Sequence, residues 1–213
     1  MTAFQLPLFP LGLVLFPGVS LPLHLFEPRY RQMLADVRDR DGRFGIICGM
    51  PGVAEGDLPE GRVGCVAEIT QVNILPDGRA DIVVVGRERF AFEQLVEDEA
   101  PYHVAVVAPL NDVHDVVPMM LIVSADDVAT RFTRVVNAVR TINDDARPMP
   151  TLPDDPAQLA YVIAAMIDLD LAEQQALLSE RSPAIRLTRV DAVLRRVLPN
   201  LEIQSALRLG RAD

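Results

Sequence analysis

The hydrophobic pattern of this chain of 213 residues changes once, near Asn111, and that change limits the folds open to it. Before Asn111, short apolar runs alternate with turn signals such as Pro17-Gly18 and Pro76-Asp77-Gly78, which is typical of β-strands joined by tight turns. After Asn111, apolar residues recur every three or four positions, as they do on amphipathic helices. A run of strands followed by a run of helices predicts an α+β fold.

The first part is expected to form a curled sheet with one helix. The helix runs from about Glu27 to Val37, where Tyr30, Met33, Leu34 and Val37 fall at helical spacing and form one apolar stripe. We expect this stripe to close one open end of the sheet. The clearest predicted strands are Phe44–Cys48, Val63–Leu75, Ala80–Gly86, Phe90–Leu95 and His103–Pro109.

The second part is expected to contain helices that pack on one another and on the sheet. Ser124 to Asp127 is interpreted as the cap of the first helix, whose apolar face begins at Val128. Pro156 opens a second helix, with Met166 and Ile167 among its inward-facing residues. Ser182-Pro183 caps the last one.

The charged residues exclude several classes of chemistry. The net charge is −10, and all 20 basic residues are arginine. A chain without lysine lacks the lysine of a phosphate-binding P-loop, of a Ser–Lys hydrolase and of a Schiff base. Because most of the negative charge falls in residues 1–123, we expect binding neither to nucleic acid nor to anionic membranes.

The first 26 residues predict the cellular compartment. Residues 3–26 contain no Asp, Glu or Arg, and four prolines interrupt them. A signal peptide needs positive charge before its apolar stretch and a small-residue cleavage site after it, and neither is present. We therefore expect a cytoplasmic protein.

No set of residues in the sequence indicates a catalytic centre, a metal site or a cofactor. His24, His103 and His114 lie far apart, without the close pairs of ligands typical of zinc sites, and His24 is interpreted as a satisfied histidine of the sheet. Cys48 and Cys65 lie in apolar runs, where burial raises a thiol pKa and lowers its reactivity. No serine occupies a G-x-S-x-G motif.

One apolar segment, Val116–Val123, has two interpretations that the sequence leaves open. It contains two methionines and a proline and lies where the two parts of the chain join. It is either core between the parts or the lining of an exposed groove, because methionine-rich apolar surfaces suit varied partners.

The beginning of the chain resembles a known family. Leu6-Pro7-Leu8-Phe9-Pro10-Leu11 and the following residues through Leu23-His24-Leu25-Phe26-Glu27-Pro28-Arg29-Tyr30 resemble the opening motif of the Lon protease N-terminal domain. Weaker likenesses follow in order at Gly64–Ile69, Pro76–Arg79, Val85–Phe90 and Leu159–Leu178. Glu173-Gln174-Gln175 departs from the lysine usual in the last of these.

The resemblance implies a small PUA-like β-barrel with one helix in residues 1–118, followed by a helical bundle in residues 119–205. In Lon proteases this region helps to recognise substrates and to assemble the oligomer, while the ATPase and peptidase lie further on. The resemblance therefore implies a stand-alone protein that is not an enzyme. The motif positions Arg29, Tyr30, Gly64, Asp77, Gly78 and Gly86 are expected to have structural roles.

Three functions are considered. The first is a recognition module that binds unfolded or partly unfolded polypeptide, or that binds a protease or chaperone and acts as its adaptor. The alternatives are a PUA-like nucleic-acid-binding module, which the negative charge opposes, and a small hydrolase with an unrecognised site, which no residue set supports.

We predict that recognition uses five residues and the unpaired edges of strands. Arg29, Arg31 and Gln32 lie off the buried stripe of the first helix, while Met120 and Leu121 supply an apolar floor. An open strand edge would accept an extended peptide through main-chain hydrogen bonds.

Overall fold

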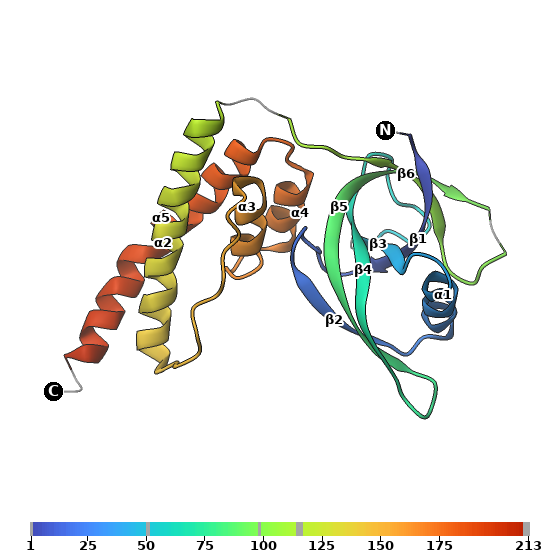
Figure 1. Ribbon diagram of the computed structural model, residues 1–213, viewed down its shortest axis with the longest axis horizontal. Coiled ribbons are helices and arrows are strands. Elements are labelled where there is room, and N and C mark those ends of the chain that lie inside the picture. Colours follow the sequence, from blue (N-terminus) through green and yellow to red (C-terminus); the bar gives the residue numbers. More distant parts are fainter. Residues whose placement is uncertain (1, 50–51, 98, 114–116, 211–213) are drawn as a thin grey trace. The chain divides into compact units, whose positions relative to one another are not determined.

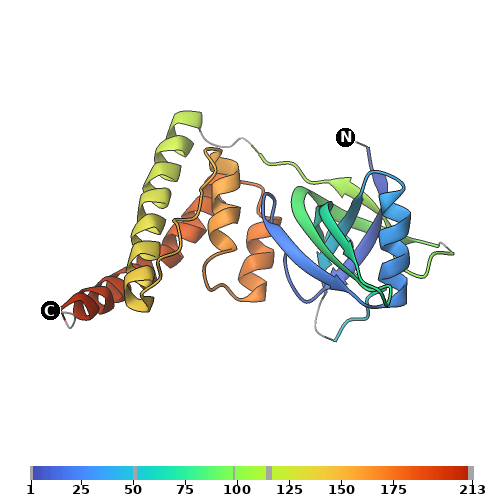
Figure 2. The ribbon, with the colours of Figure 1, turned by 60° about the horizontal axis from the view of Figure 1, so that its bottom comes forward.

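The structure, a computed structural model, describes residues 2–49, 52–97, 99–113 and 117–210. Within them the chain has the predicted α+β class, with a mixed sheet and five helices (Figures 1 and 2). The strands are β1 (Phe4–Leu11), β2 (Ser20–Leu25), β3 (Arg43–Cys48), β4 (Val63–Ile74), β5 (Ala80–Val96) and β6 (Val104–Pro109). The helices are α1 (Pro28–Arg38), α2 (Pro118–Asn143), α3 (Pro156–Ala164), α4 (Leu171–Ser179) and α5 (Pro183–Leu209).

The six strands are ordered β2-β5-β4-β3-β1-β6. β1 and β3 run parallel, with Phe9 opposite Ile46, and the other pairs are antiparallel. β5 is a single strand of 17 residues, so the two strands predicted at Ala80–Gly86 and Phe90–Leu95 are one. Its length lets it pair with β2 through its first half and with β6 through its second, where Phe92 lies opposite Val107.

The sheet is packed closely enough to require glycine within its strands, as at Gly64 of β4. Leu8, Phe90 and Val107 are fully buried in its apolar core. A Cβ atom at Gly64 would lie 2.3 Å from Cζ of Phe90 and 2.7 Å from the carbonyl oxygen of Ile46. Gly64 therefore has a structural role, as expected: because it lacks a Cβ atom, β4 can lie close to its neighbours.

Helix α1 and the β4–β5 hairpin follow the sequence pattern. Tyr30, Met33, Leu34 and Val37 are all buried, as the apolar stripe predicts. At the hairpin, Gly78 adopts a φ of 80°, which a residue with a Cβ rarely does, and Asp77 accepts a hydrogen bond from the Arg79 backbone.

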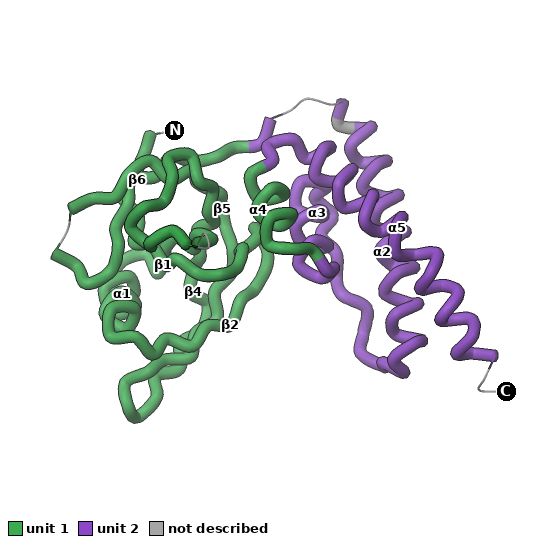
Figure 3. The backbone as a smooth tube through the Cα atoms, turned by 180° about the vertical axis from the view of Figure 1, so that it is seen from behind, with its two compact units in different colours: residues 1–111, 169–179 green, residues 112–168, 180–213 purple. Residues whose placement is uncertain are grey.

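The chain divides into two compact units, which Figure 3 colours separately. The first unit is residues 1–111 together with 169–179, so it includes α4. Two buried polar side chains hold α4 in this unit. Gln175 Nε2 donates to the Val63 carbonyl over 3.0 Å, and Arg89 Nη1 donates to the Leu178 carbonyl over 2.7 Å.

The second unit is residues 112–168 and 180–213, and in it α2 packs against α5 and α3 packs against both. The predicted Ser182 cap is confirmed, because its Oγ accepts from the Ile185 amide. The predicted cap at Ser124 is wrong. α2 begins six residues earlier, at Pro118, because proline suits a first helical turn and the apolar residues after it continue the helix.

The inward position predicted for Met166 is also wrong. α3 ends at Ala164, so the helical spacing on which that prediction rested is lost before Met166, whose side chain is 51% exposed.

One buried arginine joins three segments of the second unit. Arg186 of α5 has no exposed surface and forms a bidentate ion pair with Asp112, at 2.6 and 2.7 Å. It also donates to the backbone carbonyls of Glu180 and Ala157, and its guanidinium lies 4.4 Å from the centre of the Tyr161 ring.

Candidate binding surface

The first two turns of α2 are exposed although their side chains are apolar. Val117, Met119 and Met120 have 61%, 66% and 65% of their surface exposed, and Ile122 and Val123 are also exposed. We call these five residues the α2 apolar surface. The sequence left open whether Val116–Val123 is core or exposed, and these five residues are exposed. Leu121 is partly buried, and Val116 lies outside the described residues.

Helical geometry places two of these five residues, Met119 and Val123, on the side of α2 that faces solvent. Ala125, Val128 and Phe132 are buried and mark the side that faces the core of the second unit. Met119 and Val123, four residues apart, lie opposite that side. A helix that is apolar all round is normally covered, so the exposure of these turns indicates a surface for a partner. Met119, Ile122 and Val123 belong to the segment Val116–Val123 that the sequence left open between core and exposed surface, but they were not among the five residues predicted for recognition.

The three residues predicted on α1 are engaged within the first unit to different degrees. Arg29 hydrogen-bonds to Glu55 over 2.5 and 3.1 Å and to Glu27 over 2.8 Å, so its guanidinium is occupied. Gln32 is exposed and donates to Asp36, four residues along the helix. Arg31 lies over the β4–β5 turn, because a Cβ atom at Gly78 would approach its Nη2 to 2.2 Å.

Glu55 has several charged or polar neighbours. Its hydrogen bond from Arg29 lowers the pKa of its carboxyl group. The same hydrogen bond raises the pKa of Arg29, and burial followed by the charge of Glu55 raises the pKa of Tyr30. His103 Nε2 lies 3.9 Å from the Glu55 carboxylate. This cluster fixes the loop before β4 to the start of α1 and is therefore structural.

The lowered pKa of Glu55 predicts a pH dependence of stability. A carboxyl group whose pKa is lower in the folded state stabilises the fold above its unfolded pKa, here near the ordinary value of 4.5, and this stabilisation is lost as pH falls through the folded pKa. We expect Glu55→Gln to lower the free energy of unfolding at pH 7 by no more than about 1 kcal/mol, because the pair is partly exposed. Urea unfolding of both proteins between pH 7 and pH 3 measures this. A gap that does not shrink on acidification would contradict it.

The five predicted site residues are divided between the two units. Arg29, Arg31 and Gln32 lie in the first, and Met120 and Leu121 in the second. That the two groups act on one partner stays a prediction. The α2 apolar surface lies wholly in the second unit.

The open strand edge is a weaker candidate than the helix. In the described sheet β2 pairs with β5 alone, which leaves its other edge for an incoming strand. However, β2 contains Pro22 in its middle, and proline has no N–H to donate and is typical of edges that resist pairing.

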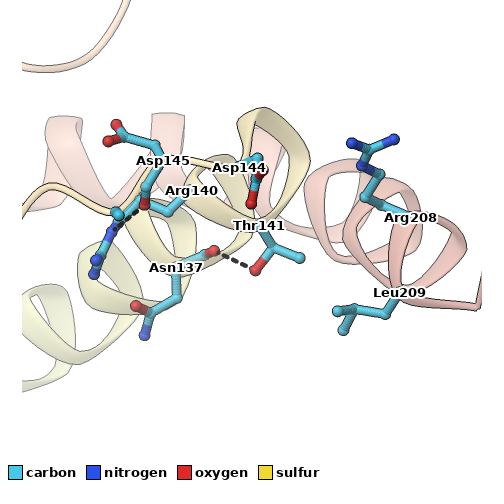
Figure 4. A pocket seen from close by; sticks show the side chains of 8 residues that line it. Asn137, Arg140, Thr141, Asp144, Asp145, Arg208 and Leu209 are labelled. Atoms are coloured by element: carbon cyan, nitrogen blue, oxygen red, sulfur yellow. Dashed lines mark hydrogen bonds between the residues drawn. The ribbon is translucent and has the colours of Figure 1, made fainter. Parts of the chain in front are cut away.

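A hollow of about 810 Å³ lies where α2 and α5 end, and Figure 4 shows its lining. Several of its polar groups bind nearby residues. Thr141 donates to the Asn137 carbonyl, Arg140 donates to the Asp145 carbonyl, and the hydrogen bonds from Arg147 lower the pKa of Asp145 to about 2. These contacts secure the turn after α2 and do not form a site for a ligand.

The histidines and cysteines lie in structural positions. His24 of β2 is exposed, with Nδ1 2.6 Å from Asp81 of β5, which confirms its interpretation as a satisfied histidine of the sheet. Burial raises the pKa of the Cys65 thiol to about 12, and Cys48 is also buried. His114 lies outside the described residues. In the part of the chain that the structure describes, no three His, Cys, Asp or Glu side chains are grouped to hold a metal ion. No helix there is long and apolar enough to span a bilayer.

Comparison with known proteins shows one family over most of the chain. Residues 5–196 match the model of the ATP-dependent protease La (LON) substrate-binding domain. The Lon protease of Cytophaga hutchinsonii is 27% identical over 203 residues, which are 93% of this chain and 25% of that protein. The Lon protease of Roseiflexus castenholzii is 30% identical over 197 residues, which are 90% of this chain and 24% of that protein. The chain thus spans about a quarter of the length of these relatives.

Two solved structures share the fold. The crystal structure of a Lon N-terminal domain protein from Xanthomonas campestris has a TM-score of 0.66 at 24% identity and covers 89% of this chain and 98% of that one. The N-terminal domain of the Mycobacterium avium complex Lon protease has a TM-score of 0.67 at 16% identity, over 90% of this chain and 98% of that one.

Proposed function

This chain belongs to the family of ATP-dependent protease La (LON) substrate-binding domains, and from this premise we propose that it recognises polypeptides through the α2 apolar surface. Family membership supports a role in substrate recognition. The observation that carries the location is the exposure of two apolar helical turns in the second unit. The largest apolar patch on a soluble protein is often functional, and methionine side chains adapt to partners of varied shape.

The size of the surface favours a short segment as the occupant. Its five side chains expose on the order of 500 Å² of apolar area, less than the roughly 800 Å² per partner of a typical stable interface. We therefore propose that it binds short apolar stretches that unfolded or partly unfolded chains expose, with affinity nearer micromolar than nanomolar.

We propose further that the chain binds these segments without hydrolysing them. The absence of lysine excludes a Ser–Lys peptidase within this sequence, and the Cys65 thiol is buried with a raised pKa, which suppresses its thiolate form. In this proposal a separate protease or chaperone acts on what is bound, which is the adaptor role considered above.

The double substitution Met119→Asp and Met120→Asp is expected to weaken binding of a labelled, permanently unfolded protein at least ten-fold. In the complex the partner would cover both methionines, so the substitution removes two apolar contacts and brings two charges into an apolar interface. The second unit on its own should lose little stability, because both side chains are exposed in the free protein. Fluorescence anisotropy measures the binding, and urea unfolding checks that the variant is folded.

Met166→Asp is the matched control, because Met166 is also exposed in the second unit but lies outside the α2 apolar surface. It should bind as the wild type does. Unchanged binding by the folded double variant would disprove the assigned surface, and a wild type that ignores unfolded chains would disprove the proposed function.

A further inference from the structure

The helical turn that follows the α2 apolar surface carries two carboxylates. Residues 117–125 contain no charged side chain, and Asp126 and Asp127 come directly after them, both exposed. Asp126 is three residues beyond Val123, and Asp127 is four, so both lie one turn from it along the solvent side of α2. The arrangement places negative charge at one end of the apolar surface.

The nearby arginines are already paired with other acids. Arg131 forms an ion pair with Asp191, which also pairs with Arg195 at 2.6 Å, and Arg134 pairs with Glu202 at 2.6 Å. Asp127 contributes to the raised pKa of Arg195, but the main cause of that rise is the hydrogen bond to Asp191. Among the described residues, Asp126 has no ion pair. Asp126, Asp127 and Asp191 are three carboxylates against two arginines, Arg131 and Arg195, so one negative charge is left over at this end of the surface.

We propose that the α2 apolar surface selects apolar segments that have basic residues beside them. This proposal rests on the proposed function and specifies the substrate class of the same site. An extended chain whose apolar side chains cover Met119 and Val123 would place its neighbouring residues beside Asp126 and Asp127. The net charge of −10 on the chain acts in the same direction over a longer range.

The same charges oppose the chief rival occupant, a second copy of this chain. Each copy carries a net charge of −10, so two copies repel each other over long range before their apolar surfaces can meet. The apolar area is also smaller than a stable dimer needs. A basic, apolar segment satisfies both features of the surface, whereas a second copy satisfies the apolar one alone.

The test compares three labelled peptides that share one apolar core and carry flanking arginines, serines or glutamates. Fluorescence anisotropy at low salt is expected to rank them arginine, serine, glutamate, with the arginine peptide bound about three- to ten-fold more tightly than the serine peptide. The advantage should shrink at high salt, because exposed charge pairs are screened. The variant with Asp126→Asn and Asp127→Asn should lose most of the preference for arginine, measured as the ratio of its dissociation constants for the serine and arginine peptides.

Asp154→Asn with Asp168→Asn is the control, because it changes the net charge equally at exposed acids of the second unit outside the surface. It should retain the preference. The charge selection would be disproved if the three peptides bound equally, or if the Asp126 and Asp127 variant kept the preference for arginine. Either result would leave the proposed recognition of polypeptides unaffected. Failure of all three peptides to bind would overturn both. Dimerisation of the wild type that the Met119 and Met120 variant abolishes would make a second copy the occupant.

Discussion

Replacing Arg186 by methionine is expected to lower the free energy of unfolding of the second unit by about 3–5 kcal/mol. The side chain has no exposed surface, and its replacement removes the ion pair with Asp112 and the hydrogen bonds to the carbonyls of Glu180 and Ala157. Methionine fills much of the same volume, so the expected loss comes from these lost polar contacts rather than from a cavity.

Urea unfolding followed by far-UV circular dichroism measures this effect, since the second unit contains the long helices α2 and α5. Hydrogen exchange should show the loss of protection in α2, α3 and α5. Arg196→Met is the matched control, because Arg196 is exposed on the same helix and should change stability by less than about 0.5 kcal/mol.

A double variant separates the ion pair from the rest of the network. Arg186→Met combined with Asp112→Leu removes both charges, so its loss of stability should be smaller than the sum of the two single losses. Strict additivity, or a loss below about 1 kcal/mol for Arg186→Met, would show that the buried network does not stabilise the second unit as its geometry implies.

The local parts of the fold were predictable because a short stretch of sequence determines them. The stripe of α1 depends on four apolar residues within eight positions, and the β4–β5 hairpin depends on Asp77 and Gly78 at the turn. The start of α2 was predicted wrongly for a related reason. Ser124 is a good helix cap, but an exposed apolar run from Met119 continues the helix equally well once Pro118 has begun it.

Long-range contacts explain what the sequence did not show. The local sequence does not mark Arg89 or Arg186 as buried, since Arg89 binds a carbonyl of α4, 89 positions away, and Arg186 binds Asp112, 74 positions away. The candidate surface was predicted in part, since its apolar character is visible in the sequence: Met120 belongs to it, whereas Leu121, also predicted there, is partly buried. The sequence left its exposure open, because exposure depends on which side of α2 packs against α5.

Replacing Gly86 by alanine is expected to lower the free energy of unfolding of the first unit by about 3 kcal/mol. A Cβ atom there would lie 2.2 Å from the carbonyl oxygen of Phe16 and 3.1 Å from Sγ of Cys65. The oxygen belongs to the backbone and cannot turn away as a side chain would. The neighbouring segment is also held by two hydrogen bonds, from the Gly86 amide to the Val19 carbonyl and from the Gly18 amide to the Gly86 carbonyl.

Relief of this clash must move the segment before β2 away from β5, which weakens those hydrogen bonds and disturbs the pairing of β2 with the first half of β5. Gly12→Ala is the matched control, since no atom lies within 4 Å of the position its Cβ would occupy, and it should change stability by less than about 0.5 kcal/mol. Urea unfolding of the three proteins measures both effects, and hydrogen exchange should place the loss in β2 and β5. If Gly86→Ala were as stable as Gly12→Ala, the close approach of Phe16 to β5 would not be what requires glycine at position 86.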